Sequence, residues 1–175
     1  MPEEVIEVPM KEQNRGSLRS HPRTLKEHLI FLIATWFYVG YSPIAPGTIG
    51  SVTAIPLLLL IALFASPLVY CIIVLILLVI AVFVSYKAEG MLCCQDPSQI
   101  VIDEVVGFLA TMVFIPLGWK NIMGGLLIFR LMDITKPFPV GRAEALKRGV
   151  GVVADDFVAA VYANIILRII MRFFP

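Results

Sequence analysis

Seven carboxylates lie directly outside long apolar runs of this chain. An ionised carboxylate at a membrane boundary costs little by itself, but several at one boundary repel each other unless a cation or a basic substrate lies between them. The pattern therefore predicts a cation-dependent site at a membrane surface. The seven residues are Glu89, Asp96, Asp103, Glu104, Asp133, Asp155 and Asp156.

The composition predicts an integral membrane protein. Of the 175 residues, 59% are hydrophobic and 15% are charged, whereas soluble proteins have about 45–50% and about 25%. A formal net charge of +1, without interleaved arginines and aromatics, argues against nucleic acid as a partner.

The apolar runs predict an all-α, multi-span membrane bundle with four to five spans. Residues 49–64 and 68–84 are expected to form a helical hairpin with both ends on one side. Thr48 is the expected N-cap of the first helix, and Asp96 of a later one. Further helices are expected over 97–114, 122–132 and 157–174. Residues 29–39 are too short to span and predict an interfacial helix. We expect one membrane domain over 29–175, preceded by a polar segment over 1–28.

The order of the spans predicts that the carboxylates converge. If the basic N-terminal segment is cytoplasmic, residues 42–51, 87–104 and 133–156 lie on the cytoplasmic side. The same orientation places Arg142 inside and Lys120 outside, as the positive-inside rule favours. Arg168 and Arg172 do not fit it: either they extend to the outer interface, or one short segment does not cross.

Three motifs resemble the phosphatidylglycerophosphatase A family of bacterial membrane lipid phosphatases. They are Ser-Pro-Ile-Ala-Pro-Gly-Thr-Ile-Gly-Ser at 42–51, Asp-Pro-Ser-Gln-Ile-Val-Ile-Asp-Glu-Val-Val-Gly at 96–107, and Phe-Arg-Leu-Met-Asp-Ile-Thr-Lys-Pro-Phe-Pro at 129–139 followed by Gly-Val-Gly-Val-Val-Ala-Asp-Asp at 149–156. The resemblance implies a Mg²⁺-dependent enzyme of the bacterial inner membrane. It would convert phosphatidylglycerophosphate to phosphatidylglycerol and phosphate at the cytoplasmic face, in phospholipid biosynthesis.

Other phosphatase chemistries lack their residues here. Neither Cys93 nor Cys94 is followed by an arginine at the gap that a cysteine nucleophile needs. His21 and His28 both lie in the N-terminal segment, and no Asp-x-Asp nucleophile motif occurs. Oxygen ligands remain, and they suit Mg²⁺. The metal would either activate water or position a carboxylate for attack, and both mechanisms stay open.

The carboxylates have structural alternatives as well. Asp96 can serve only as an N-cap, Asp133 can pair with Arg130, and Glu89 is expected to be a solvated loop acid. The pair at 103–104 can be a solvated interfacial pair, and one of the pair at 155–156 can cap the last helix. The predicted metal ligands are Asp96, Asp103, Glu104, Asp133, Asp155 and Asp156, and the predicted catalytic residues are Asp103, Glu104, Asp133 and Asp156.

Four residues are predicted to bind the phosphate or the headgroup. Lys136 is the first, because the stiff Lys-Pro-Phe-Pro segment holds it. Ser42 and Thr48 belong to a loop and helix start whose N–H groups suit an anion, and Arg142 attracts an anionic headgroup. The alternative for Lys136 is plain contact with lipid headgroups. For Ser42 and Thr48 it is a simple interfacial turn, and for Arg142 it is positive-inside anchoring.

A proton- or cation-coupled transporter is the competing class of function. Acids at membrane edges and broken helices occur in transporters. Against this class, no inverted repeat is visible, and the acids lie at helix ends instead of mid-span.

Overall fold

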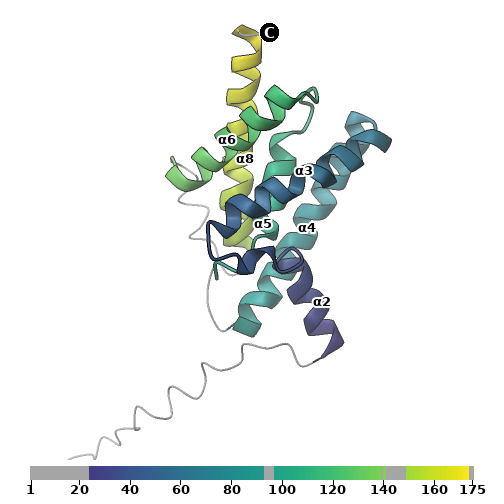
Figure 1. The fold of residues 1–175 in the computed structure, drawn as a ribbon, viewed down its shortest axis with the longest axis vertical. Helices are drawn as coiled ribbons and strands as arrows, with labels where there is room; N and C mark the ends of the chain where they lie inside the picture. The colour runs from purple at the N-terminus through teal and green to yellow at the C-terminus, as the bar shows by residue number, and fades with distance from the viewer. Residues whose placement is uncertain (1–23, 93–96, 139, 141–148, 174–175) are drawn as a thin grey trace, which may run out of the picture.

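The computed structural model describes residues 24–92, 97–138, 140 and 149–173, and all regular structure in these ranges is helical (Figure 1). This confirms the predicted all-α fold. The elements are α2 (Leu25–Ala34), the 3₁₀ helix η1 (Val39–Tyr41), α3 (Pro46–Phe64), α4 (Pro67–Leu92), α5 (Ile102–Thr111), α6 (Trp119–Thr135) and α8 (Val150–Phe173).

Three helices, α3, α4 and α8, are long and apolar enough to cross a membrane. The predicted count of four to five spans is therefore only approximate. Helix α5 has 10 residues, about 15 Å at 1.5 Å per residue, or half of a hydrocarbon core about 30 Å thick. Helix α6 has 17 residues and returns from the far end to the level where α5 begins.

The hairpin of α3 and α4 is confirmed, but its first helix begins earlier than predicted. Pro46 occupies the first helical turn and Ala45 is the N-cap, in a left-handed conformation with φ 43°. The prediction of Thr48 as N-cap is therefore wrong. Proline favours the first turn of a helix, where its missing N–H costs nothing.

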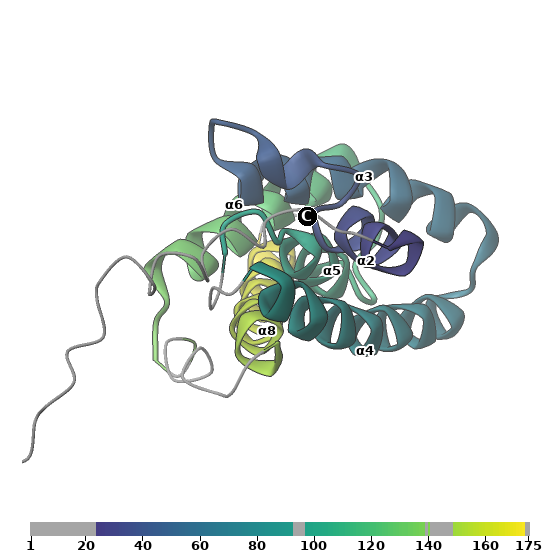
Figure 2. The same cartoon turned by 90° about the horizontal axis from the view of Figure 1, so that it is seen from below.

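Helix α5 lies at the centre of the bundle, where α3, α4 and α8 surround it (Figure 2). Eight of its ten residues are buried. The predicted helix start at residue 97 is wrong, because Pro97 begins a turn that the Ile100 N–H closes at 2.9 Å. The Val101 N–H then bonds to the Ala34 carbonyl at 3.0 Å, which ties the turn to α2. Asp96 lies outside the described residues.

The far end of α5 is capped by side chains of α8. Asn164 Nδ2 donates to the carbonyls of Thr111 and Val113, at 2.7 and 2.9 Å. Arg168 donates to Val113 at 2.9 Å and to Asn164 Oδ1 at 2.7 Å. A helix that ends at membrane depth must have its last carbonyls satisfied by protein groups. Arg168 therefore has hydrogen-bond partners within the bundle.

Two further predicted helix boundaries are wrong, and both errors concern acids. Helix α8 begins at Val150, so Asp155 and Asp156 lie in its second turn and cap nothing. Helix α4 continues to Leu92, so Glu89 is helical and 3% exposed instead of a solvated loop acid. In both cases polar residues continue a helix because neighbouring helices bury them.

The N-terminal helix is also shifted from its predicted range of 29–39. A capping box of Thr24 and Glu27 starts α2, and the helix ends at Ala34. Trp36, Phe37 and Tyr38 then take positive φ values of 46°, 57° and 67°, which an α-helix does not contain.

Candidate metal centre

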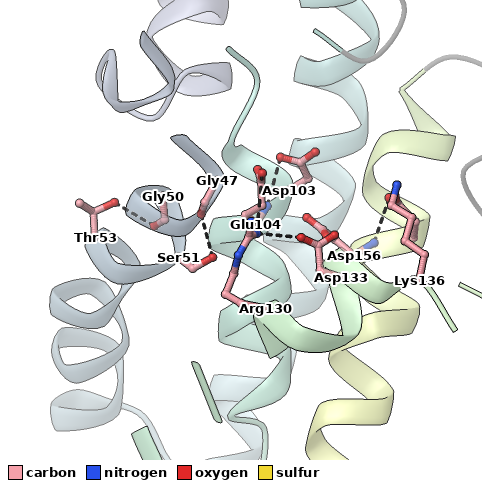
Figure 3. Close-up of polar contacts among 11 residues, drawn as sticks. Gly47, Gly50, Ser51, Thr53, Asp103, Glu104, Arg130, Asp133, Lys136 and Asp156 are labelled. Atoms are coloured by element: carbon pink, nitrogen blue, oxygen red, sulfur yellow. Dashed lines mark hydrogen bonds and ion pairs between the residues drawn. The ribbon is translucent and has the colours of Figure 1, made fainter. Parts of the chain in front are cut away.

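Three carboxylates meet where α5 begins (Figure 3). Asp103 and Glu104 belong to the first turn of α5, and Asp156 belongs to the second turn of α8. One oxygen of each lies within 4.8 Å of the others. Asp103 and Asp156 are only 6% and 3% exposed. We call these residues the carboxylate trio.

Helix α8 approaches α5 closely because Gly107 has no side chain. A Cβ at Gly107 would lie 2.7 Å from the ring of Phe129 and 3.3 Å from the Cβ of Asp156. Gly107 is one helical turn beyond Asp103. The small residue therefore lets Asp156 reach the two acids of α5.

The first turn of α3 closes another side of the trio. A Cβ at Gly47 would overlap the carboxylate of Glu104, and it would lie 3.1 Å from Arg130 Nη2. No side chain of the described residues caps α3, and the first N–H groups of a helix have no partner within the helix. The start of α3 therefore faces the site with its backbone.

Helix α6 adds an ion pair beside the trio. Arg130 Nη1 lies 2.9 Å from Asp133 Oδ2 and 3.9 Å from Glu104 Oε1. Asp133 in turn contacts the carboxyl group of Asp156. The alternative in which Asp133 pairs with Arg130 is confirmed, yet the pair stays within the cluster. Arg130 was not predicted as a site residue, although it belongs to the motif at 129–139 and lies three residues before Asp133.

Lys136 and Asp155 form a second pair at the edge of the cluster. Lys136 Nζ lies 2.8 Å from Asp155 Oδ2, and the other oxygen of Asp155 accepts the N–H of Asp156 at 3.0 Å. The trio does not include Asp155. The Lys136 side chain is 31% exposed, twice the 15% of Arg130.

The other predicted substrate contacts are less closely placed. The Ser42 hydroxyl bonds within its own turn, donating to the Ile44 carbonyl at 3.1 Å. Thr48 is half-buried in the first turn of α3, one residue after Gly47. Arg142, like Asp96, lies outside the described residues.

The trio fits a divalent cation. Burial raises the pKa of Asp103 well above its usual range, and the neighbouring charges of Glu104 and Asp156 raise it further. Glu104 Oε2 is buried and has no hydrogen-bond partner in the described part of the chain. A cation between the three groups would relieve the repulsion and coordinate the unsatisfied oxygen. An oxygen-only donor set suits a hard ion.

Comparison with known proteins gives a family match over most of the chain. The family model described as "Phosphatidylglycerophosphatase A" matches residues 32–171. The chain is 34% identical over 146 residues to "Phosphatidylglycerophosphatase A" of Escherichia coli K12, covering 82% of this chain and 84% of the relative. It is 32% identical over 140 residues to the protein of that name in Haemophilus influenzae, covering 79% and 86%.

A further relative is named for a different activity. The chain is 34% identical over 146 residues to a "Putative phosphatidylinositol-3-phosphatase" of Bacteroides thetaiotaomicron, covering 79% of this chain and 91% of the relative. No solved structure matches the chain.

Proposed function

The chain belongs to the phosphatidylglycerophosphatase A family and is a phosphatase, and we propose that it hydrolyses phosphatidylglycerophosphate in a Mg²⁺-dependent reaction at the cytoplasmic face of a bacterial inner membrane. The observation that carries this proposal is the carboxylate trio, in which one Glu104 oxygen is unsatisfied within the described residues, beside the half-buried Arg130. The product is phosphatidylglycerol, with release of phosphate.

The carboxylates hold the metal in this proposal. Asp103, Glu104 and Asp156 are its ligands, and Asp133 supports them through its contact with Asp156. Mg²⁺ supplies Lewis-acid stabilisation of the negative charge on the phosphoryl group. Carboxylates whose pKa is raised by burial are ionised when a cation neutralises them, so the metal and the acids stabilise each other.

Two cations of different exposure bind the phosphate. Arg130 pairs with Asp133, but its Nε and Nη1 make no hydrogen bond of good geometry in the described part of the chain. A guanidinium held in this way can donate to phosphate oxygens. Lys136, more exposed at the edge, attracts the charged headgroup. The start of α3, with Gly47 and Thr48, contributes backbone N–H groups.

The basic residues favour a cytoplasmic site. Residues 1–23 precede α2, and residues 141–148 connect α6 to α8, so both join the chain at the end that carries the trio. Together they contain seven Lys and Arg. Lys120, Arg168 and Arg172 belong to the opposite end, at the start of α6 and the end of α8. An excess of basic residues in the segments that join the chain at this end is the pattern of a cytoplasmic side.

An inositol lipid with a 3-phosphate is the second candidate substrate. The similarity to the Bacteroides relative favours it. Both lipids present a phosphate monoester at the membrane surface, and the same trio serves either one. The candidates differ in the headgroup that the exposed edge of the site must accept.

The test is phosphate release by purified protein in lipid nanodiscs. Phosphatidylglycerophosphate, phosphatidylinositol 3-phosphate and water-soluble glycerol 3-phosphate are compared, each with Mg²⁺ and with a chelator. We expect the first lipid to be hydrolysed fastest, and only with Mg²⁺. Faster hydrolysis of the inositol lipid would reassign the substrate. No phosphate release from any of the three would overturn the proposed activity and favour the transporter.

A further inference from the structure

We infer that Glu89 is a positioning residue for the metal centre, because it fixes the start of the helix that carries Asp156. The inference rests on the proposed metal-binding role of the trio. Glu89 is a buried acid that the reaction itself does not use. It lies near the end of α4, and the group of acids suited to a metal does not include it.

Glu89 bonds to the backbone at the point where α8 begins. Its Oε2 accepts the N–H of Gly149 at 2.7 Å, across 60 residues of sequence. Glu89 is 3% exposed, so water does not replace this bond. Val150, the next residue, is the first of α8. In a capping box an acid of the same helix accepts the N-cap N–H; here an acid of another helix accepts the N–H that precedes α8.

The backbone at Gly149 leaves little freedom for α8 to move. Gly149 has φ +65°, and a Cβ there would lie 2.6–2.7 Å from the backbone and Cβ of Tyr86. It therefore lies directly on the turn of α4 that precedes Glu89. A helix start held by both close packing and a buried hydrogen bond has a defined position along α4.

This position is transmitted to the trio through a short length of rigid helix. Asp156 is six residues after Val150, about 9 Å along the helix axis. Asp103 and Glu104 belong to α5, which also packs against α4. Helix α4 therefore contacts both helices that carry the trio, and it fixes their positions relative to each other. Loss of the Glu89 bond would let Asp156 shift relative to Asp103 and Glu104.

The same helix offers a matched control. Tyr70 of α4 is also buried, and its hydroxyl donates to the Leu109 carbonyl at 2.7 Å. That bond, like the bond of Glu89, joins α4 to the backbone of another helix. It lies at the far end of α5, near Thr111. Tyr70→Phe therefore removes a comparable bond without touching the start of α8.

The test is direct binding of Mn²⁺, followed by electron paramagnetic resonance, to the full-length protein in nanodiscs. Four proteins are compared: wild type, Glu89→Gln, Glu89→Met and Tyr70→Phe. Glutamine keeps an oxygen acceptor, and methionine has similar length without one. We expect about 10-fold weaker Mn²⁺ binding for Glu89→Met, the scale for losing a group that orients a metal ligand. Glu89→Gln and Tyr70→Phe should stay within about 3-fold of wild type.

The outcomes separate this inference from the proposed function. Wild-type protein that binds no Mn²⁺ would refute the metal centre itself. Wild-type binding with equal affinities in Glu89→Met would overturn the positioning role alone, as would equal losses in Glu89→Met and Tyr70→Phe. A Glu89→Met protein that fails to fold while Tyr70→Phe folds would also overturn it, because Glu89 would then serve the whole fold.

Discussion

Helix α8 contacts both ends of α5, yet the polar groups at the two ends are arranged in opposite ways. At the far end, Asn164 of α8 donates to the carbonyl of Thr111, the last residue of α5, and Arg168 of α8 donates to the carbonyl of Val113 just beyond it. At the near end, Asp156 of α8 is brought against two acids of α5. The first arrangement pairs donors with acceptors, whereas the second gathers three carboxylates and leaves one Glu104 oxygen without a donor in the described part of the chain.

The difference distinguishes buried polar groups that stabilise the fold from buried polar groups that are available to a ligand. A polar group in an apolar bundle costs several kcal/mol unless it is satisfied. The far end meets this demand within the protein and has no need of a ligand. The near end leaves a buried Glu104 oxygen without a partner among the described residues, which suits the binding of an ion. We expect substitutions at the two ends to affect different quantities.

Replacing a ligand of the trio should have the greatest consequence. Asp103→Asn removes one charged oxygen donor, and we expect phosphate release to fall about 100-fold or more, as for other lost electrostatic contacts at a transition state. Without metal, Asp103→Asn should have a melting temperature no lower than that of metal-free wild type, because replacing the carboxylate with an amide relieves the repulsion within the trio. Rates and melting curves check both. A lower metal-free melting temperature would assign Asp103 to the fold.

Adding one methyl group beside the trio should be nearly as harmful. Gly47→Ala places a Cβ against the Glu104 carboxylate, and we expect about a 10-fold or greater loss of phosphate release. Gly118→Ala is the matched control, because a Cβ there meets nothing within 4 Å and the residue precedes α6. Its rate should stay within about 2-fold. Equal rates for the two variants would show that the start of α3 is not part of the site.

The exposed cation at the near end should affect substrate binding more than turnover. Lys136→Gln breaks the pair with Asp155 and removes a charge from the edge of the site. We expect KM to rise about 3- to 10-fold, the equivalent of about 1 kcal/mol, with kcat little changed. Steady-state kinetics measures the two separately. A fall in kcat with an unchanged KM would instead place Lys136 at the reacting phosphate.

Substitutions at the far end should change stability and leave catalysis almost intact. Arg168→Met removes one bond to Val113 and one to Asn164. We expect a loss of about 1–3 kcal/mol in the free energy of unfolding, the usual range for hydrogen bonds of charged groups. Activity per folded molecule should stay within about 2-fold. A large loss of activity at unchanged stability would contradict the division between the two ends.

The sequence allowed the hairpin and the convergence of the acids to be predicted. The apolar runs over 49–64 and 68–84 come close to the length of a membrane span, and the helices formed there, α3 and α4, are long and apolar enough to cross a membrane. The order of the runs then placed the acids at 103, 104 and 156 on one side. The structure brings these three together.

The errors arose where tertiary contacts override local signals. Asp155 and Asp156 resemble a helix start in sequence, but α8 already begins at Val150. Glu89 follows the polar residue Lys87 and precedes a glycine, yet burial against Gly149 keeps it helical. The contact of Arg130 with Glu104 joins two helices, so no local spacing indicates it.

The most direct measurement is the dependence of phosphate release on Mg²⁺ for wild type and Asp156→Asn, with phosphatidylglycerophosphate in nanodiscs. Asp156 is the one ligand of the trio that α8 supplies, so it tests whether two separate helices form one metal centre. We expect no release by wild type in chelator, a saturable rise with Mg²⁺, and little release by Asp156→Asn at any Mg²⁺ concentration. Wild-type release that persists in chelator, or a Mg²⁺ curve unchanged by Asp156→Asn, would contradict a metal centre formed by the trio.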